Sequence, residues 1–132
     1  MTIDTTATEK GLAEIVAGWT SLVSGVSIFR GQIPDGKAEG VAVALLDDLS
    51  GNTPELPLFN AQVYVKRTSR DAAREVADLI LDQLPAFGLA GNGVAFNSIL
   101  RRGGAAAFQV DDGGEIRHVC TINLTVRFYP AG

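Results

Sequence analysis

The sequence predicts an α+β fold in which two amphipathic helices pack on one face of a mostly antiparallel sheet of four or five strands. Three observations predict this fold class. Apolar residues recur at helical spacing in two segments, a long segment near the C-terminus alternates between apolar and polar residues, and an Asp-Asp-Gly-Gly turn signal precedes that segment. We expect one domain over residues 1–132, with a polar and flexible lead-in over residues 1–8.

The first helix is predicted over residues 8–24. Thr6 and Glu9 have the spacing of a capping box, in which side chains accept hydrogen bonds from free amides at the helix start. Gly25 follows the segment and favours the left-handed conformation that ends many helices. The apolar stripe that faces the sheet comprises Leu12, Ile15, Val16, Trp19, Leu22 and Val23.

Two strands are predicted after this helix. Residues 26–30 form a short strand, and a Pro-Asp-Gly signal places a turn within residues 31–40. Residues 41–46 are an unbroken apolar run, which is typical of a strand covered on both faces.

A further strand is predicted over residues 60–67, after a glycine- and proline-containing loop over residues 47–57. This strand alternates, with Ala61, Val63 and Val65 on one face and longer polar or aromatic side chains on the other. The alternation indicates a strand that is buried on one face only.

The second helix is predicted over residues 68–84. Thr68 and Ser69 are good N-terminal caps, and Pro85 stops the helix because proline lacks an amide hydrogen. Three closely spaced glycines after Pro85 predict a loose connection. The apolar arc of the helix comprises Ala72, Ala73, Val76, Leu79, Ile80 and Leu84.

The C-terminal hairpin is the clearest element. Its arms are predicted over residues 94–110 and 115–129, joined by the Asp-Asp-Gly-Gly turn. Gly103 and Gly104 are expected to bend or bulge the first arm. The apolar face of the second arm comprises Ile116, His118, Cys120, Ile122, Leu124, Val126 and Phe128.

The composition restricts the possible functions. The 15 acidic and 11 basic residues give a net charge of −4 at pH 7, which argues against a dedicated nucleic-acid-binding domain. A single cysteine excludes an intrachain disulfide and favours a reducing compartment. Because we find neither a signal peptide nor an apolar run of the ~20 residues that cross a bilayer, we expect synthesis in the cytoplasm.

No residue pattern typical of an active site is present in the sequence. His118 is the only histidine, which excludes a multi-histidine metal site, and its strand spacing from Cys120 is unsuited to a nucleophile–base pair. We therefore predict no catalytic residue, no metal site and no cofactor. Basic residues cluster around the start of the second helix, at Lys66, Arg67, Arg70 and Arg74. No aromatic residues are interleaved with them, so a surface for stacking nucleic-acid bases is not predicted. Phosphate binding at the start of this helix is an alternative.

Charged residues outside the core are the candidate contacts with other subunits. Acidic residues line the outer side of the second helix, and paired arginines and paired aspartates lie on the C-terminal hairpin. Opposite charges of this kind can set the register between neighbouring subunits. The candidate assembly contacts are Asp71, Glu75, Asp78, Asp82, Arg101, Arg102, Asp111 and Asp112.

The order of these elements resembles the tail-terminator and minor-capsid proteins of tailed bacteriophages, which act at the head–tail junction. The local features that carry the resemblance are YVKR at residues 64–67 and FQVDDGGE at residues 108–115 leading into INLTVRFY at residues 122–129. The resemblance covers residues 9–129 and is one of architecture, without an invariant motif.

The resemblance implies a non-enzymatic virion protein that forms a ring, commonly of six subunits. Such a ring caps the growing tail tube, binds the tail-tube protein on one side and accepts the head-completion or connector protein on the other. A ring can do this because a closed head-to-tail interface leaves two different faces free. The resemblance implies no catalytic residues, no sequence-specific nucleic-acid contact and no membrane contact.

Two other classes of function remain open from the sequence. The chain is alternatively another neck, tail-completion or tail-tube component of related fold. A small-molecule binding module is a further alternative, and in that case His118 and Trp19 are candidates for lining the ligand pocket.

Overall fold

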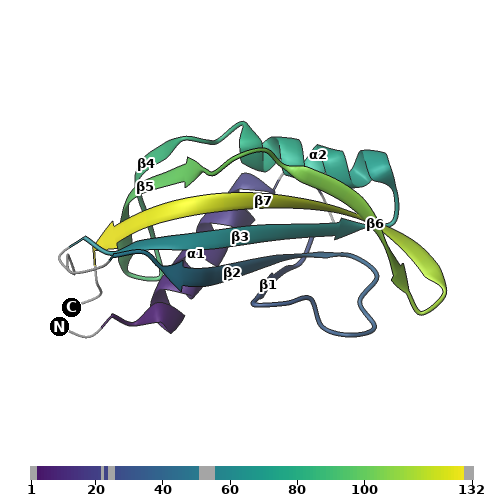
Figure 1. The fold of residues 1–132 in the computed structure, drawn as a ribbon, viewed down its shortest axis with the longest axis horizontal. Helices are drawn as coiled ribbons and strands as arrows, with labels where there is room; N and C mark the ends of the chain where they lie inside the picture. The colour runs from purple at the N-terminus through teal and green to yellow at the C-terminus, as the bar shows by residue number, and fades with distance from the viewer. Residues whose placement is uncertain (1–2, 22, 24–25, 51–55, 130–132) are drawn as a thin grey trace.

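The computed structural model describes residues 3–21, 23, 26–50 and 56–129, which form two helices and seven strands (Figure 1). The helix count agrees with the sequence-based prediction, whereas the strand count exceeds it. The elements are α1 (Thr5–Trp19), β1 (Ile28–Arg30), β2 (Gly40–Asp48), β3 (Leu58–Arg67), α2 (Arg70–Leu81), β4 (Ala86–Gly91), β5 (Val94–Arg101), β6 (Ala106–Asp112) and β7 (Glu115–Tyr129).

The strands form a single sheet in the order β1-β2-β3-β7-β5-β4, and β6 pairs with β7 beside β5. The β1–β2 pair is parallel and the other pairs are antiparallel, so the sheet is mixed. The long strand β7 is central because it pairs with β3 along one edge and with β5 and β6 in succession along the other. β3 and β7 therefore hold the sheet together.

Both helices lie on the same face of the sheet. α2 packs on β3 and β7, whereas α1 contacts β1 and β2 at one edge and β4 at the other. These contacts require the sheet to curl around α1, as Figure 1 shows for β4 and β5 at one side of the helix. The space between helices and sheet is filled by aliphatic and aromatic side chains, among them Leu12, Val16, Val43, Val63, Val65, Ile80, Phe96, Ile122, Leu124 and Phe128.

The start of α1 differs from the prediction. Asp4 caps the helix, with its side chain accepting a hydrogen bond from the Ala7 amide at 3.0 Å, so the predicted capping box is wrong. The Glu9 side chain instead extends from α1 to β2, where its carboxylate accepts a hydrogen bond from the Leu45 amide at 3.0 Å. The helix ends at Trp19, earlier than predicted, and the predicted end at residues 24–25 lies outside the described residues.

α2 begins as predicted and ends earlier. Ser69 is the N-cap, and its hydroxyl accepts a hydrogen bond from the Ala72 amide at 3.1 Å. The helix ends at Leu81, and beyond the Asp82 cap the amides of Gln83 and Leu84 bond to carbonyls three residues back. Because the residue before a proline disfavours helical backbone angles, the segment tightens before Pro85 is reached.

β3 confirms its predicted alternation, whereas β2 is covered on both faces only over its first half. Val41 and Val43 on one face and Ala42 on the other are buried, but Leu46 is 45% exposed. In the second half of β2, the Glu9 side chain of α1 reaches Leu45 but leaves Leu46 exposed, so the prediction of a fully covered strand over residues 41–46 is wrong there.

The connection after α2 is a hairpin and not a loose loop. Asn92 and Gly93 both have positive φ, of 49° and 76°, which is the conformation of the tight turns that join antiparallel strands. This turn joins β4 to β5. The predicted bend at Gly103 and Gly104 is confirmed, because the chain between β5 and β6 breaks the first arm there.

Candidate functional site

The β6–β7 hairpin projects beyond the part of the sheet that the helices cover (Figure 1). Ile116 belongs to the predicted apolar face of β7, yet it is 58% exposed because no helix lies over it. Phe108 on β6 is also exposed. Since β6 pairs with β7 alone, its other edge carries backbone amides and carbonyls without a strand partner among the described residues. This edge is the free edge of β6.

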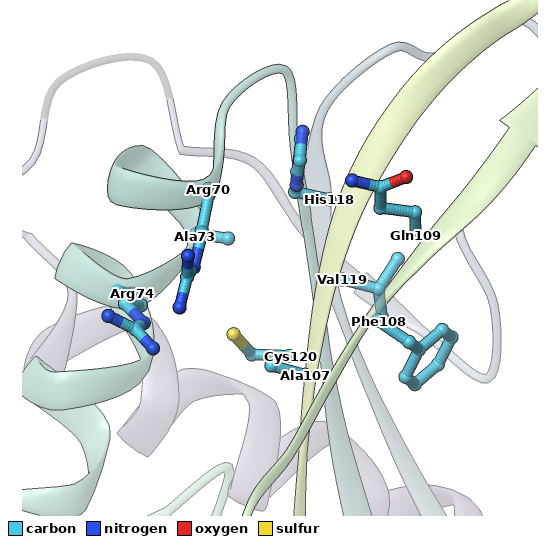
Figure 2. A pocket seen from close by; sticks show the side chains of 9 residues that line it. All are labelled: Arg70, Ala73, Arg74, Ala107, Phe108, Gln109, His118, Val119 and Cys120. Carbon is cyan, nitrogen blue, oxygen red and sulfur yellow. The ribbon is translucent and has the colours of Figure 1, made fainter.

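A pocket of about 240 Å³ lies between α2 and the root of this hairpin (Figure 2). We call it the α2 pocket. Figure 2 shows the Cys120 sulfur directed toward α2, whereas the Phe108 ring points to the opposite side of the sheet. The residues that line the pocket are Arg70, Ala73, Arg74, Ala107, Phe108, Gln109, His118, Val119 and Cys120.

The α2 pocket has an apolar floor and a cationic rim. Ala73, Ala107 and Cys120 supply small side chains, whereas Arg70 and Arg74 extend from exposed positions on α2. Within the described part of the chain, neither arginine makes an ion pair or a hydrogen bond through its side chain. The pocket therefore offers positive charge that no carboxylate of its own lining neutralises.

His118 and Cys120 both line this pocket, but no hydrogen bond joins them in the described structure. Burial raises the pKa of the Cys120 thiol, because a thiolate loses solvation there. A cysteine nucleophile needs the opposite shift, toward the thiolate. Trp19, the other candidate for lining a ligand pocket, does not line this one.

The hairpin candidates Arg101, Arg102, Asp111 and Asp112 lie at the two ends of β6. Arg101 ends β5 and its Nε donates to the Gly103 carbonyl at 3.0 Å, and Arg102 is exposed. Asp111 accepts a hydrogen bond from the Gly114 amide at 2.8 Å, and Asp112 forms an ion pair with Lys66 at 2.9 Å. The two aspartates thus hold the hairpin in shape and are partly used within the chain.

The acidic candidates on the second helix are all exposed. Asp71, Glu75 and Asp78 lie within α2, and Asp82 caps its C-terminal end. No ion pair involves them in the described residues. In the described residues, no ion pair or hydrogen bond joins these four acidic side chains to Arg101 or Arg102.

A second exposed segment lies at the end of β2, where a covered strand over residues 41–46 was predicted to pass into a loop over residues 47–57. Leu46 and Leu49 are 45% and 46% exposed, and the two aspartates between them are exposed as well. β1 covers the outer edge of β2 only along Val41–Val43. Beyond it the Leu45 amide donates to the Glu9 carboxylate, and the rest of the edge has no strand partner among the described residues. The apolar run of residues 41–46 ends in two carboxylates, Asp47 and Asp48, which is where the predicted loop begins.

The described residues contain no group of three or more histidine, cysteine, aspartate or glutamate side chains arranged to hold a metal ion. Among them there is also no helix that is long and apolar enough to span a bilayer.

The fold occurs in a chain of a solved virion structure. A chain in the solved structure of the "Virion of native gene transfer agent (GTA) particle" matches this chain with a TM-score of 0.53 and 17% sequence identity, over 87% of this chain and 84% of that chain. At this identity the likeness shows a shared fold. The sequence matches no family model, and no curated protein matches it.

Proposed function

We propose that this chain is a structural protein of a phage-like virion, and specifically a tail terminator that forms a ring at the head–tail junction. The ring, expected to contain six subunits, caps the tail tube and offers its other side to the head-completion or connector protein. The proposed role is structural, without catalysis, cofactor, direct nucleic-acid readout or membrane contact. Its place is the virion, after synthesis in the host cytoplasm.

One observation carries this proposal, namely the fold shared with a chain of a gene transfer agent virion over 87% of the residues. The match includes most of the chain, so it concerns the whole arrangement of helices and sheet and not a common small motif. The sequence resemblance to tail terminators was drawn from the order of the same elements and points to the same class of particle.

The shape of the molecule supports a ring. Within the described part of the chain, strand edges without a strand partner occur on both sides of the sheet, at the second half of β2 and at β6. A chain with two different edges on opposite sides is suited to head-to-tail association, which closes into a ring when the rotation per subunit closes. The two faces of that ring then differ, as a junction between tail and head requires.

The test is the length of tails made without the protein. In the particle whose genome encodes this chain, deletion of the gene is expected to yield tail tubes of irregular length and filled heads without tails, as seen by negative-stain electron microscopy. Supply of the intact chain from a plasmid restores tails of uniform length. Tails of normal length after deletion would contradict the terminator role.

The same experiment separates the alternative virion roles. A tail-tube protein is expected to leave no tubes at all when its gene is deleted, and the purified protein polymerises into open stacks. A different neck protein leaves tubes of normal length that fail to join heads. Particles that are normal in both respects would favour the small-molecule binding module.

A further inference from the structure

Most of the free edge of β6 lacks the features that protect edge strands in monomeric proteins. Residues 103–110 contain no charged side chain and no proline, and residues 104–109 are all exposed. Edge strands normally carry lysine, proline or a bulge, because unpaired backbone amides and carbonyls otherwise pair with another chain. Charged side chains occur only at the last two positions of β6, Asp111 and Asp112. The absence of such protection over residues 106–110 indicates that this part of the edge is paired in the functional state.

The α2 pocket lies directly beside this edge. Ala107 and Gln109 of β6 line the pocket, and side chains on an added strand would stand next to them on the same face of the sheet. The pocket volume of about 240 Å³ is below the roughly 300–1,000 Å³ of small-molecule sites. The pocket is suited to a single apolar side chain with acidic neighbours, because its floor is apolar and Arg70 and Arg74 form its rim.

The same chain offers a segment of this chemistry at the opposite edge of the sheet. The end of β2 and the residue after it carry two half-exposed leucines, Leu46 and Leu49, on either side of Asp47 and Asp48. Hydrogen bonds from Ser50 hold the pKa of Asp48 below its usual value, so this carboxylate is charged at neutral pH. Leucines beside two carboxylates are complementary to an apolar pocket with an arginine rim.

We infer that the free edge of β6 in one copy pairs with the second half of β2 in a second copy. Asp47 and Asp48 of the second copy then face Arg70 and Arg74 of the first, and Leu46 or Leu49 enters the α2 pocket. The two edges lie on opposite sides of the sheet, so the contact is head-to-tail and can repeat around a ring. This inference rests on the proposed function, since it supplies the contact between subunits of the terminator ring.

Charge reversal at both sides of the contact tests this pairing. One variant carries Arg70→Glu and Arg74→Glu, and the other carries Asp47→Arg and Asp48→Arg. Each variant alone places like charges across every contact, so the dissociation constant for assembly, measured by light scattering, is expected to rise at least about tenfold. An equimolar mixture of the two variants restores assembly, because each contact again joins opposite charges, and so does one chain with all four changes.

A matched control separates this effect from net charge. Lys10→Glu with Lys37→Glu changes the net charge by the same amount as the arginine variant, at two exposed positions outside both edges. This control is expected to assemble like the unaltered chain. Thermal unfolding followed by circular dichroism checks that each variant folds. Assembly of either reversed variant at the unaltered affinity, or failure of the mixture to recover, would overturn the inference.

Cross-linking provides a second measurement that does not need a stable ring. In a Cys120→Ala background, one chain carries Ala107→Cys and another carries Leu46→Cys, and the two are mixed under oxidising conditions. The expected product is a disulfide-linked pair that contains one chain of each kind. Leu49→Cys is tested in the same way, because Leu49 is the other leucine that can enter the pocket. Pairs of the Ala107→Cys chain with itself would indicate a symmetric dimer and overturn the inference, as would the absence of a cross-link to both leucine positions.

The experiments distinguish a failure of the inferred β6–β2 contact from a failure of the proposed terminator function. Rings that form from the unaltered chain and are indifferent to charge reversal would overturn only the β6–β2 contact. A confirmed contact together with tails of normal length after gene deletion would overturn only the terminator role.

Discussion

At the scale of single residues, the most constrained contact joins two glycines. A methyl group added at Gly11 of α1 would overlap the Gly91 carbonyl, and one added at Gly91 would overlap the Gly11 carbonyl. The neighbouring turn is tied to the same helix, because the Asn92 amide donates to the Glu14 carboxylate at 2.6 Å. Glycine is required at both positions because the backbone of α1 lies directly against β4.

Replacement of Gly11 by alanine is therefore expected to destabilise the protein. The overlap forces α1 away from β4, and such overpacking lowers the free energy of unfolding by about 1–3 kcal/mol. Gly18→Ala in the same helix is the control, since a methyl group there contacts nothing and removes backbone freedom from the unfolded chain. It is expected to stabilise by about 0.5 kcal/mol. Urea unfolding measures both, and a Gly11→Ala variant as stable as the parent would contradict the packing.

Glu39 supports the start of α2 through charge. Its carboxylate accepts hydrogen bonds from the Arg67 Nε at 2.7 Å and from the Thr68 amide at 3.1 Å. The hydrogen bond from Arg67 is the main cause that lowers the pKa of Glu39 below its usual value. A lowered folded-state pKa adds stability at pH values above the unfolded pKa, and that stability is lost as pH falls through the folded pKa.

Glu39→Gln is expected to lower the melting temperature at neutral pH and to have a smaller effect in acid. Because the ion pair is partly exposed, the loss at pH 7 is expected to stay within about 1 kcal/mol. Melting curves of the parent and the variant between pH 2 and pH 7 should converge at the acid end. A difference that is constant with pH would indicate that the charge of Glu39 has no role.

At the scale of secondary-structure elements, the strands differ in how completely they are paired. β3 lies between β2 and β7 and has a partner on each side, whereas β6 has β7 as its only strand partner among the described residues. Local opening is easiest where few contacts and many exposed backbone bonds occur. The projecting β6–β7 hairpin is therefore expected to be the least protected part of the sheet in the isolated subunit.

Amide hydrogen exchange tests this difference. In a dilute sample, the β6 amides are expected to exchange orders of magnitude faster than the β3 amides, which open only with the core. When assembly is induced, the protection of β6 should rise while that of β3 stays the same. Equal protection of β6 and β3 in dilute subunits would show that the edge of β6 is already covered.

At the scale of the whole molecule, the distribution of charge matters more than its sum. The net charge is −4, but the charges are unevenly distributed. Arg70 and Arg74 form a cationic rim at the α2 pocket, and Asp47 and Asp48 are exposed at the opposite edge of the sheet. Copies of the chain repel weakly at long range, yet they present opposite charges where the two edges meet. Association that depends on such exposed pairs is screened by salt.

Assembly is accordingly expected to weaken as salt is added. Raising the ionic strength from about 0.05 M to about 0.5 M shortens the screening length from more than 10 Å to less than 5 Å and weakens the contact between exposed charges. Light scattering at fixed protein concentration measures the change. Assembly that strengthens with salt would indicate a contact dominated by apolar burial instead.

The sequence alone was sufficient for the elements whose signal is local. Three features depend only on residues that are near neighbours in the chain, and each was predicted from the sequence. They are the apolar spacing of both helices, the alternation of β3 and the turn at the tip of the β6–β7 hairpin. The bend at Gly103 was predicted for the same reason. The β4–β5 hairpin was missed, although Asn92 and Gly93 are a typical turn pair, because the preceding glycines masked the short strand β4.

Only the tertiary structure decided which parts of these elements are left uncovered. Contacts between residues distant in sequence determine how far β2 extends beyond β1 and how far β6 projects past the helices. The same kind of contact brings Arg70, Arg74 and Cys120 to one pocket. Glu9 shows the same limit, since its partner Leu45 is 36 residues away. Local patterns determine what each segment can form, whereas the free edges depend on how the segments cover one another.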